Sequence, residues 1–160
     1  MDDLVCVKPV HHLPGKFKRG SVVYTEPVIG FIRRTTQTLD VMVYSLTHPV
    51  IAQELLSLHQ RGVRVRVVVD RLQASSRYSK ADLIGYAGIE VRIEKQQGAM
   101  HHKVAICDID VRGKNAVLSG SFNWTISAAE RNEENAIIIR NKSDCLKAQE
   151  EFDRLWELNA

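Results

Sequence analysis

Two short clusters of polar residues in the second half of the chain have types and spacing that could do chemistry together. The first is His101, followed by Lys103 and then by Asp108, with the small apolar run Val104-Ala105-Ile106-Cys107 between them. Such a run predicts a buried β-strand. Because side chains alternate between the faces of a strand, we expect His101 and Lys103 to share one face and Asp108 to point to the other.

A histidine next to a fixed ammonium group suits attack on an anionic centre such as a phosphodiester. Asp108 cannot easily join that group, so we expect it to have a structural role. The second cluster, Ser119-Gly120-Ser121-Phe122-Asn123, follows after one short connection. Taken alone, a His-x-Lys pattern usually has no function, and a Gly-Ser pair is usually part of a turn. The order of the two clusters and their short separation point to one site.

The two clusters, H-x-K-x4-D followed by G-S-x-N, resemble the HKD signature of the phospholipase D superfamily. Residues 24–141 are similar to the small single-motif bacterial endonucleases of that superfamily. The resemblance implies that His101 attacks phosphorus and forms a covalent phosphohistidine. It also implies that Lys103 holds the non-bridging oxygens, and that Ser121 and Asn123 contact the phosphate.

The resemblance further implies a downstream acid that orients and charges a histidine from the opposite half of the site. Glu134 matches this acid, within Asn132-Glu133-Glu134-Asn135-Ala136. Glu133 is the alternative, because the loop length in this region could shift the match by one residue. His102 is expected to face away from His101 on the strand and to be structural.

The motif occurs only once, and the sequence contains no internal repeat. The family's complete site needs two copies, in which one histidine attacks and the other protonates the leaving oxygen. We therefore expect a symmetric homodimer, since a two-fold axis brings the same patch of each subunit together. His101 and Lys103 of both chains would converge on one phosphate. The alternative is a monomer that uses water or a different side chain as the acid.

Family members with lipid substrates generally carry two motif copies in a longer chain, so the resemblance favours DNA or RNA as the substrate. The alternatives are a phospholipase or cardiolipin-type hydrolase and a nucleic-acid-binding module without activity. The motif residues His101, Lys103, Ser121 and Asn123 are all present, which speaks against the inactive module. No cofactor is expected. Because no metal-ligand set accompanies the motif, we expect hydrolysis to be metal-independent.

The charge distribution mildly favours a polyanionic partner. Residues 1–129 contain 17 Lys and Arg against 11 Asp and Glu, a surplus of 6 positive charges, whereas residues 130–160 contain 5 against 8. The three cysteines are scattered and fit neither a disulfide framework nor a zinc pattern. We expect ordinary reduced thiols.

The sequence predicts no membrane anchor. No apolar run approaches the roughly 18 residues of a membrane span, and the acidic N-terminus lacks the layout of a signal peptide. We therefore expect no stable membrane association and a cytoplasmic protein, unless a signal peptide has been removed. His11-His12 could bind a metal, but without other ligand-spaced residues an exposed polar pair is favoured.

Hydrophobic periodicity predicts strands alternating with helices, which indicates an α/β layered domain with a mixed sheet flanked by helices. Residues 1–20 are expected to form an irregular arm and residues 21–160 a single catalytic domain. Besides the motif strand, the predicted strands are residues 21–25, 39–46, 63–69, 89–93, 116–119 and 134–140. The predicted helices are 28–38, one from Thr47-His48-Pro49 to Gly62, one from a capping box of Ser79 and Asp82 to Gly88, 124–129, and 143–158 with Leu146, Phe152, Leu155 and Trp156 inward.

Overall fold

The structure is a computed structural model that describes residues 3–7 and 25–160. The His11-His12 pair and residues 21–24 of the first predicted strand lie outside the described residues. So does most of the predicted N-terminal arm. The part of that arm that is described, Asp3–Val7, differs from the expectation because it is a strand and not irregular.

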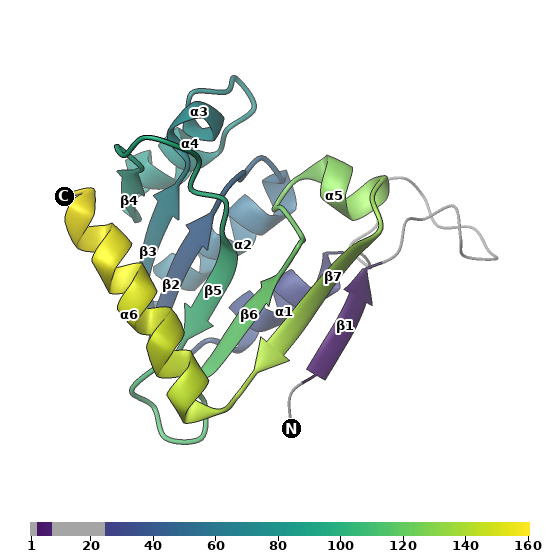
Figure 1. Ribbon diagram of the computed structural model, residues 1–160, viewed down its shortest axis with the longest axis vertical. Coiled ribbons are helices and arrows are strands. Elements are labelled where there is room, and N and C mark those ends of the chain that lie inside the picture. Colours follow the sequence, from purple (N-terminus) through teal and green to yellow (C-terminus); the bar gives the residue numbers. More distant parts are fainter. Residues whose placement is uncertain (1–2, 8–24) are drawn as a thin grey trace.

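Within the described residues, seven strands form one mixed sheet in the order β1-β7-β6-β5-β2-β3-β4 (Figure 1). Strands β2, β3 and β4 are mutually parallel, and each neighbouring pair from β2 through β5, β6 and β7 to β1 is antiparallel. The predicted α/β fold with a mixed sheet is confirmed. The strands are β1 Asp3–Val7, β2 Thr38–Val43, β3 Arg64–Val69, β4 Glu90–Ile93, β5 Lys103–Cys107, β6 Ala116–Gly120 and β7 Glu134–Ile139.

Helices cover both faces of the sheet (Figure 1). Helices α1 and α2 lie on one face, and the long C-terminal helix α6 crosses the other. In the part of the chain that the structure describes, three short helices lie in the connections between strands. The helices are α1 Glu26–Arg34, α2 Pro49–Gln60, α3 Arg71–Ala74, α4 Ala81–Tyr86, α5 Ile126–Glu130 and α6 Lys142–Leu158. None of the helices in the described ranges is long and apolar enough to cross a membrane.

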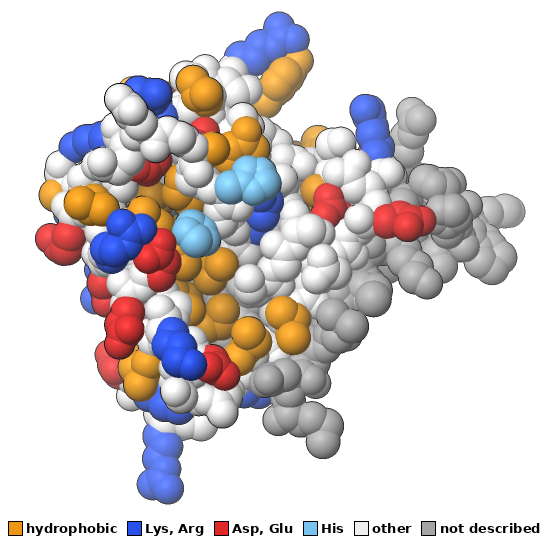
Figure 2. Space-filling model, in the orientation of Figure 1, with side chains coloured by type: hydrophobic (Ala, Val, Ile, Leu, Met, Phe, Trp, Pro, Cys, Tyr) orange, Lys and Arg blue, Asp and Glu red, His pale blue; other side chains and the backbone are white. Residues whose placement is uncertain are grey.

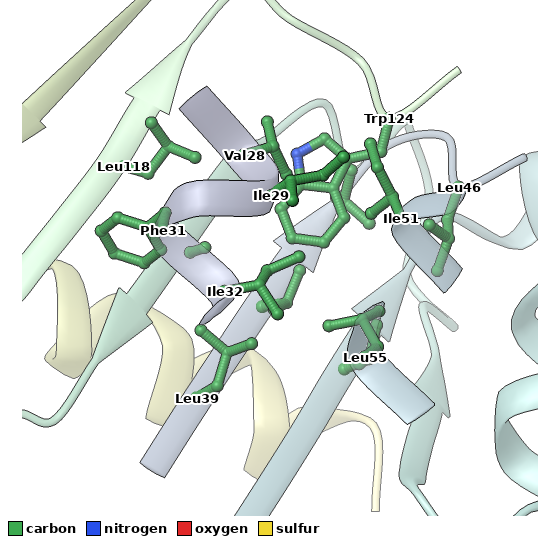
Figure 3. Close-up of a cluster of buried hydrophobic side chains, with 14 of the residues drawn as sticks. Val28, Ile29, Phe31, Ile32, Leu39, Leu46, Ile51, Leu55, Leu118 and Trp124 are labelled. Carbon is green, nitrogen blue, oxygen red and sulfur yellow. The ribbon is translucent and has the colours of Figure 1, made fainter. Parts of the chain in front are cut away.

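Each face of the sheet has its own hydrophobic core, because residues of the central strands alternate between the two sides. On the face of α1 and α2, Phe31 and Ile32 of α1 pack with Trp124, which comes from the connection after β6 (Figure 3). On the opposite face, Phe152 and Trp156 of α6 cover Ile106 of β5, together with other strand residues. In β3 the run Val67-Val68-Val69 is completely buried, as its sequence predicts.

The predicted helices differ from the structure at some ends and caps: α1 ends at Arg34 and not at residue 38, where β2 already begins. His48 caps α2, because its Nδ1 accepts the N–H of Val50 at 3.2 Å. The predicted capping box of α4 is wrong: Ser79 Oγ accepts only the N–H of Ala81, and Lys80 occupies the cap position without a side-chain bond. Leu146 of α6, which was expected to point inward, is 42% exposed.

The topology brings several strand ends to one edge of the sheet. The parallel strands β2, β3 and β4 end there, and so does β6, which runs in the same direction. The antiparallel strands β5 and β7 begin at the same edge. Both polar clusters of the sequence therefore meet there, since the first lies at the start of β5 and the second at the end of β6.

Candidate active site

The side chains of His101 and Lys103 are in direct contact at the start of β5. The ammonium Nζ of Lys103 lies 3.0 Å from Nδ1 and 3.2 Å from Nε2 of His101, and it donates a hydrogen bond to the His101 carbonyl oxygen at 2.8 Å. The imidazole is exposed and the lysine half-buried. This pair, predicted from the spacing of the two residues, presents a nucleophile and a positive charge together at the surface.

Tyr44, which follows β2, forms the wall behind this pair. Its ring centroid lies 4.6 Å from that of His101, and Lys103 Nζ lies 5.2 Å from the centre of the tyrosine ring. The Tyr44 hydroxyl accepts a hydrogen bond from Nε2 of Gln73 at 3.2 Å. Partial burial lowers the pKa of Lys103, while the negative charge of Glu134 acts in the opposite direction.

His102 points to the other face of the sheet, as the alternation of the strand predicts. Its Nε2 lies 3.3 Å from Oε1 of Glu151, which belongs to α6. Glu151 in turn accepts two hydrogen bonds from Arg154, both at 2.8 Å. The hydrogen bond with Arg154 is the largest influence on Glu151 and lowers the pKa of its carboxyl group.

Ser121 and Glu134 meet where β6 ends and β7 begins. The hydroxyl of Ser121 donates a hydrogen bond to Oε2 of Glu134 and accepts the N–H of Asn135 at 3.1 Å. Nδ2 of Asn132 donates to Oε1 of Glu134 at 2.9 Å. Of the two acids that the sequence left open, Glu134 is therefore the one tied to Ser121 and close enough to act on Lys103.

The contact between Ser121 and Glu134 depends on an unusually close approach of their strands at Gly120. A Cβ atom added to Gly120 would lie 2.2 Å from the carbonyl oxygen of Asn135. The N–H of Ser121 donates to this same oxygen at 3.0 Å. Glycine is required here because any side chain would collide with the backbone of β7.

Buried aromatic residues hold the second cluster in place. Phe122 and Trp124 are 3% and 2% exposed, so they belong to the core. The N–H of Trp124 donates to the carbonyl of Ser45 at 3.1 Å, which ties the cluster to the connection after β2. Asn123 lies between the two aromatic residues, and its buried Oδ1 has no hydrogen-bond partner among the described residues.

Asp108 lies at the far end of β5, away from the other motif residues. Its carboxylate accepts the backbone N–H groups of Thr36, Gln37 and Thr38 at 2.7 to 3.2 Å, and also the Thr36 hydroxyl at 3.0 Å. The Asp108 backbone has a positive φ of 49°. Asp108 therefore fixes the entry into β2 and does not contact the His101–Lys103 pair.

Sequence reasoning missed Asp70, which supports the segment before His101. Asp70 is 2% exposed, its Oδ1 accepts the N–H groups of Leu72 and Gln73, both at 3.0 Å, and its Oδ2 accepts the N–H of Met100 at 3.1 Å. One signal was present, because Asp70 directly follows the buried run of β3 at the carboxyl end of a parallel strand.

No group of three or more His, Cys, Asp or Glu within residues 3–7 and 25–160 is placed to hold a metal ion. Cys107 and Cys145 are buried free thiols. Burial is the main cause that raises the pKa of Cys107 to about 11. The side chain of Cys6 lies outside the described part of the chain.

Residues 28–156 match the family model for the cardiolipin synthase, phospholipase D-like domain. The chain is 36% identical over 151 residues to a mitochondrial cardiolipin hydrolase of Chlamydomonas reinhardtii, covering 91% of this chain and 66% of that protein. The human mitochondrial cardiolipin hydrolase is 39% identical over 120 residues, which is 75% of this chain and 46% of the relative. The chain thus spans less than two thirds of the length of these relatives.

Solved structures match over nearly the whole chain. Nuc from Salmonella typhimurium, a phospholipase D family member, superposes with a TM-score of 0.79 at 29% identity, covering 98% of this chain and 95% of that one. NucT from Helicobacter pylori superposes with a TM-score of 0.75 at 23% identity, covering 98% of this chain and 96% of that one. At this identity the match supports the fold and no conclusion about function.

Proposed function

The chain belongs to the phospholipase D superfamily, and on this premise we propose that it is a metal-independent phosphodiesterase that cleaves nucleic acid. The observation that carries the proposal is the contact of the exposed His101 imidazole with the Lys103 ammonium at 3.0 Å. A neutral imidazole nitrogen is a nucleophile, and the adjacent cation stabilises negative charge that develops on a phosphoryl group in the transition state.

In the proposed reaction, an imidazole nitrogen of His101 bonds to phosphorus, and the bond from phosphorus to the leaving oxygen breaks. A second histidine gives its proton to that oxygen. Water then attacks the phosphohistidine, transferring a proton to the second histidine and releasing the phosphate monoester and a free His101. Ser121 and Asn123 are proposed to contact the non-bridging oxygens of the phosphate together with Lys103.

The second histidine is proposed to come from another copy of the chain. The neighbouring histidine His102 is turned toward Glu151 on the other face and cannot serve the same phosphate. A two-fold axis close to His101 would bring the matching residue of a second subunit to the opposite side of the phosphate. Glu134 is proposed to orient and charge that histidine.

The surface beside the site offers a contact area for such a homodimer. Helix α6 packs against β2, β5 and β6, while Val104, Ile137 and Ile139 on the same face of the sheet are only half-buried. Figure 2 shows hydrophobic side chains in a patch beside two histidines on this face. Contiguous apolar surface of this kind is typical of protein interfaces.

Nucleic acid is the proposed substrate because the site is polar and because the larger part of the chain carries more Lys and Arg than Asp and Glu. The surplus of Lys and Arg in residues 1–129 favours a polyanion. A lipid phosphodiester is the second candidate, since the relatives above are named as cardiolipin hydrolases. Both substrates would use the same attack by His101, so only the group beyond the phosphate distinguishes them.

Labelled single-stranded DNA, double-stranded DNA, RNA and cardiolipin vesicles, each incubated with the protein and excess EDTA, test the proposal. We expect cleavage of nucleic acid that persists in EDTA and is lost in His101→Ala. Loss of cleavage in EDTA and its return with a divalent ion would contradict the metal-independent mechanism. Release of phosphatidate without cleavage of DNA or RNA would select the lipid substrate instead.

A further inference from the structure

The connection between α3 and α4 lies beside the proposed active site, because both of its ends are fixed to the wall behind the histidine. At its start, Nε2 of Gln73 donates to the hydroxyl of Tyr44, whose ring packs against the imidazole of His101. At its end, the N–H of Lys80 donates to the carbonyl of Leu46 at 2.9 Å. In Figure 1 this connection projects at the top of the molecule, at the edge of the sheet where β2 and β3 end.

The tip of this connection, residues 75–79, presents an aromatic ring to solvent, and we call it the Tyr78 loop. Tyr78 is 59% exposed. The guanidinium carbon of Arg77 lies 4.6 Å from the centre of the tyrosine ring, and Nη2 of Arg77 donates to the tyrosine hydroxyl. The arginine covers one face of the ring and holds it in one orientation. The remaining surface of the ring is open to a ligand, and the ring is positioned before that ligand binds.

The sequence around the Tyr78 loop is positively charged. Residues 71–81 contain Arg71, Arg77 and Lys80 and no Asp or Glu. The acidic residue that precedes them, Asp70, is buried, and its carboxylate accepts backbone N–H groups. Figure 2 shows basic and hydrophobic side chains together at this projecting end of the molecule. A ring between cations suits a single-stranded nucleic acid, because the cations attract its phosphates and the ring stacks on a base.

The Tyr78 loop is close enough to the proposed nucleophile to hold a base near the cleaved phosphate. Tyr78 lies two residues before Lys80, and therefore at most about 7 Å of chain from the hydrogen bond to Leu46. On the other side of that bond, Tyr44 lies two residues before Leu46 and packs against His101. A base stacked on Tyr78 would therefore belong to a nucleotide within a few positions of the phosphate at His101.

We propose that the Tyr78 loop is a subsite in which Tyr78 stacks on one unpaired base of the strand that is cleaved, an inference that rests on the nuclease function proposed above. A base inside a duplex is stacked between its neighbours and shows only its edges, so the exposed ring can take a base only from a single strand. Stacking tolerates all four bases, because each has a flat π face. The subsite therefore gives a preference for single-stranded over double-stranded nucleic acid, without a preference for one base.

Binding of a labelled single-stranded oligonucleotide tests the subsite, measured with the His101→Ala protein as parent so that the strand is not cleaved. We expect Tyr78→Ala in this parent to weaken binding about tenfold, as when a base-stacking aromatic residue is replaced by alanine. Tyr78→Phe should bind as the parent does, because it keeps the ring, and double-stranded DNA should bind all three proteins equally. Tyr86→Ala is the matched control, since Tyr86 is 93% exposed on α4 and its loss should leave binding unchanged.

Abasic nucleotides separate stacking from a general loss of affinity. One abasic nucleotide, placed at successive positions of the oligonucleotide, should weaken binding to the parent most at the base that Tyr78 stacks on. Adding Tyr78→Ala should abolish that loss, because the ring and the base then no longer interact. An abasic loss of the same size in both proteins, or a Tyr78→Ala variant that binds as the parent does, overturns the subsite and leaves the nuclease function standing.

Cardiolipin vesicles and the proteins with an intact His101 distinguish failure of the subsite from failure of the proposed function. If Tyr78→Ala slows hydrolysis of cardiolipin in vesicles but not cleavage of single-stranded DNA or RNA, the Tyr78 loop contacts a lipid surface and the subsite is overturned. Absence of nucleic acid cleavage by the wild type, together with hydrolysis of cardiolipin, overturns the nuclease function itself, and the subsite with it.

Discussion

The carboxylate of Asp70 accepts the backbone N–H of Met100, the residue immediately before His101, at 3.1 Å. The same side chain caps α3, whose Gln73 donates a hydrogen bond to the hydroxyl of Tyr44, and the ring of Tyr44 packs against the imidazole of His101. One buried group thus supports the proposed nucleophile, His101, both through its backbone and through its ring neighbour. Asp70 is a positioning residue in this arrangement, because it does not itself reach the phosphate site.

Asp70→Ala should lower kcat by as much as roughly 10²-fold, the cost of a small misplacement of reacting groups. KM should change less, since Lys103, the residue proposed to hold the phosphate, is unchanged. We expect a stability loss of about 1–3 kcal/mol from the lost cap and the buried N–H of Met100. Asp70→Asn, which keeps an acceptor, should restore part of kcat. Steady-state kinetics and urea unfolding measure both effects; unchanged kcat would exclude a positioning role.

His101→Ala should reduce turnover by at least about 10³-fold, as expected for a nucleophile that acts with other groups as a unit. The free energy of unfolding should stay close to that of the wild type, because the His101 side chain is exposed. His102→Ala is the matched control, since it removes the adjacent histidine that faces Glu151. Equal losses in the two variants would contradict the assignment of the nucleophile.

Activity should fall at alkaline pH as Lys103 loses its proton. Burial lowers the pKa of Lys103 from its ordinary value of 10.5, so the loss should begin at lower pH than for an exposed lysine. In the pH range between its folded and unfolded pKa values, Lys103 is protonated in more unfolded chains than folded ones. The free energy of unfolding therefore rises with pH over this range. Lys103→Arg should shift the alkaline limb upward. A pH–rate profile that is identical in both proteins would contradict the prediction.

Mixed dimers of wild-type and His101→Ala chains separate a shared site from independent sites. Two different affinity tags allow the mixed species to be purified and its size to be confirmed by sedimentation. If both histidines serve one phosphate, the mixed dimer should be nearly inactive. Independent sites would leave it half as active as the wild type. Full activity of a protein that sediments as a monomer would rule out the shared site altogether.

Asp108→Ala should destabilise the fold strongly, on the order of 3 kcal/mol or more. The substitution leaves three backbone N–H groups and the Thr36 hydroxyl without their acceptor. Asp110→Ala, two residues later at an exposed position, should change stability little. Chemical denaturation of the two variants measures the difference, and comparable small effects in both would show that Asp108 does not fix the entry to β2.

Local patterns in the sequence predicted most strands and helices of this fold. Buried residues recur at every second position of a strand and at about every 3.6 residues of a helix, so apolar side chains mark each element. The run before Asp108 predicted β5, and strand alternation placed His101 with Lys103 and turned His102 away. Long-range partners were beyond such patterns. Nothing near Asp70 indicates Met100, which is 30 residues away, and nothing near Asp108 indicates Thr36, which is 72 residues away.

The cap and face predictions failed where several local solutions compete. Ser79 and Asp82 have the spacing of a capping box, yet the chain enters α4 through Lys80. Leu146 fits the apolar stripe of α6, but it lies on the first turns of the helix, where its side chain stays largely exposed. Tertiary packing decides such cases, and it cannot be read from periodicity alone.

Gly120 limits how this part of the chain can vary. Any larger residue would push the backbone of β7 away at Asn135, and the first group to be displaced would be Glu134, one residue earlier. The two strands would separate at the position where Ser121 must reach its partner. If this codon is randomised and active clones are selected, glycine alone should be recovered. The absence of a side chain thus matters as much to the proposed chemistry as the side chains that surround it.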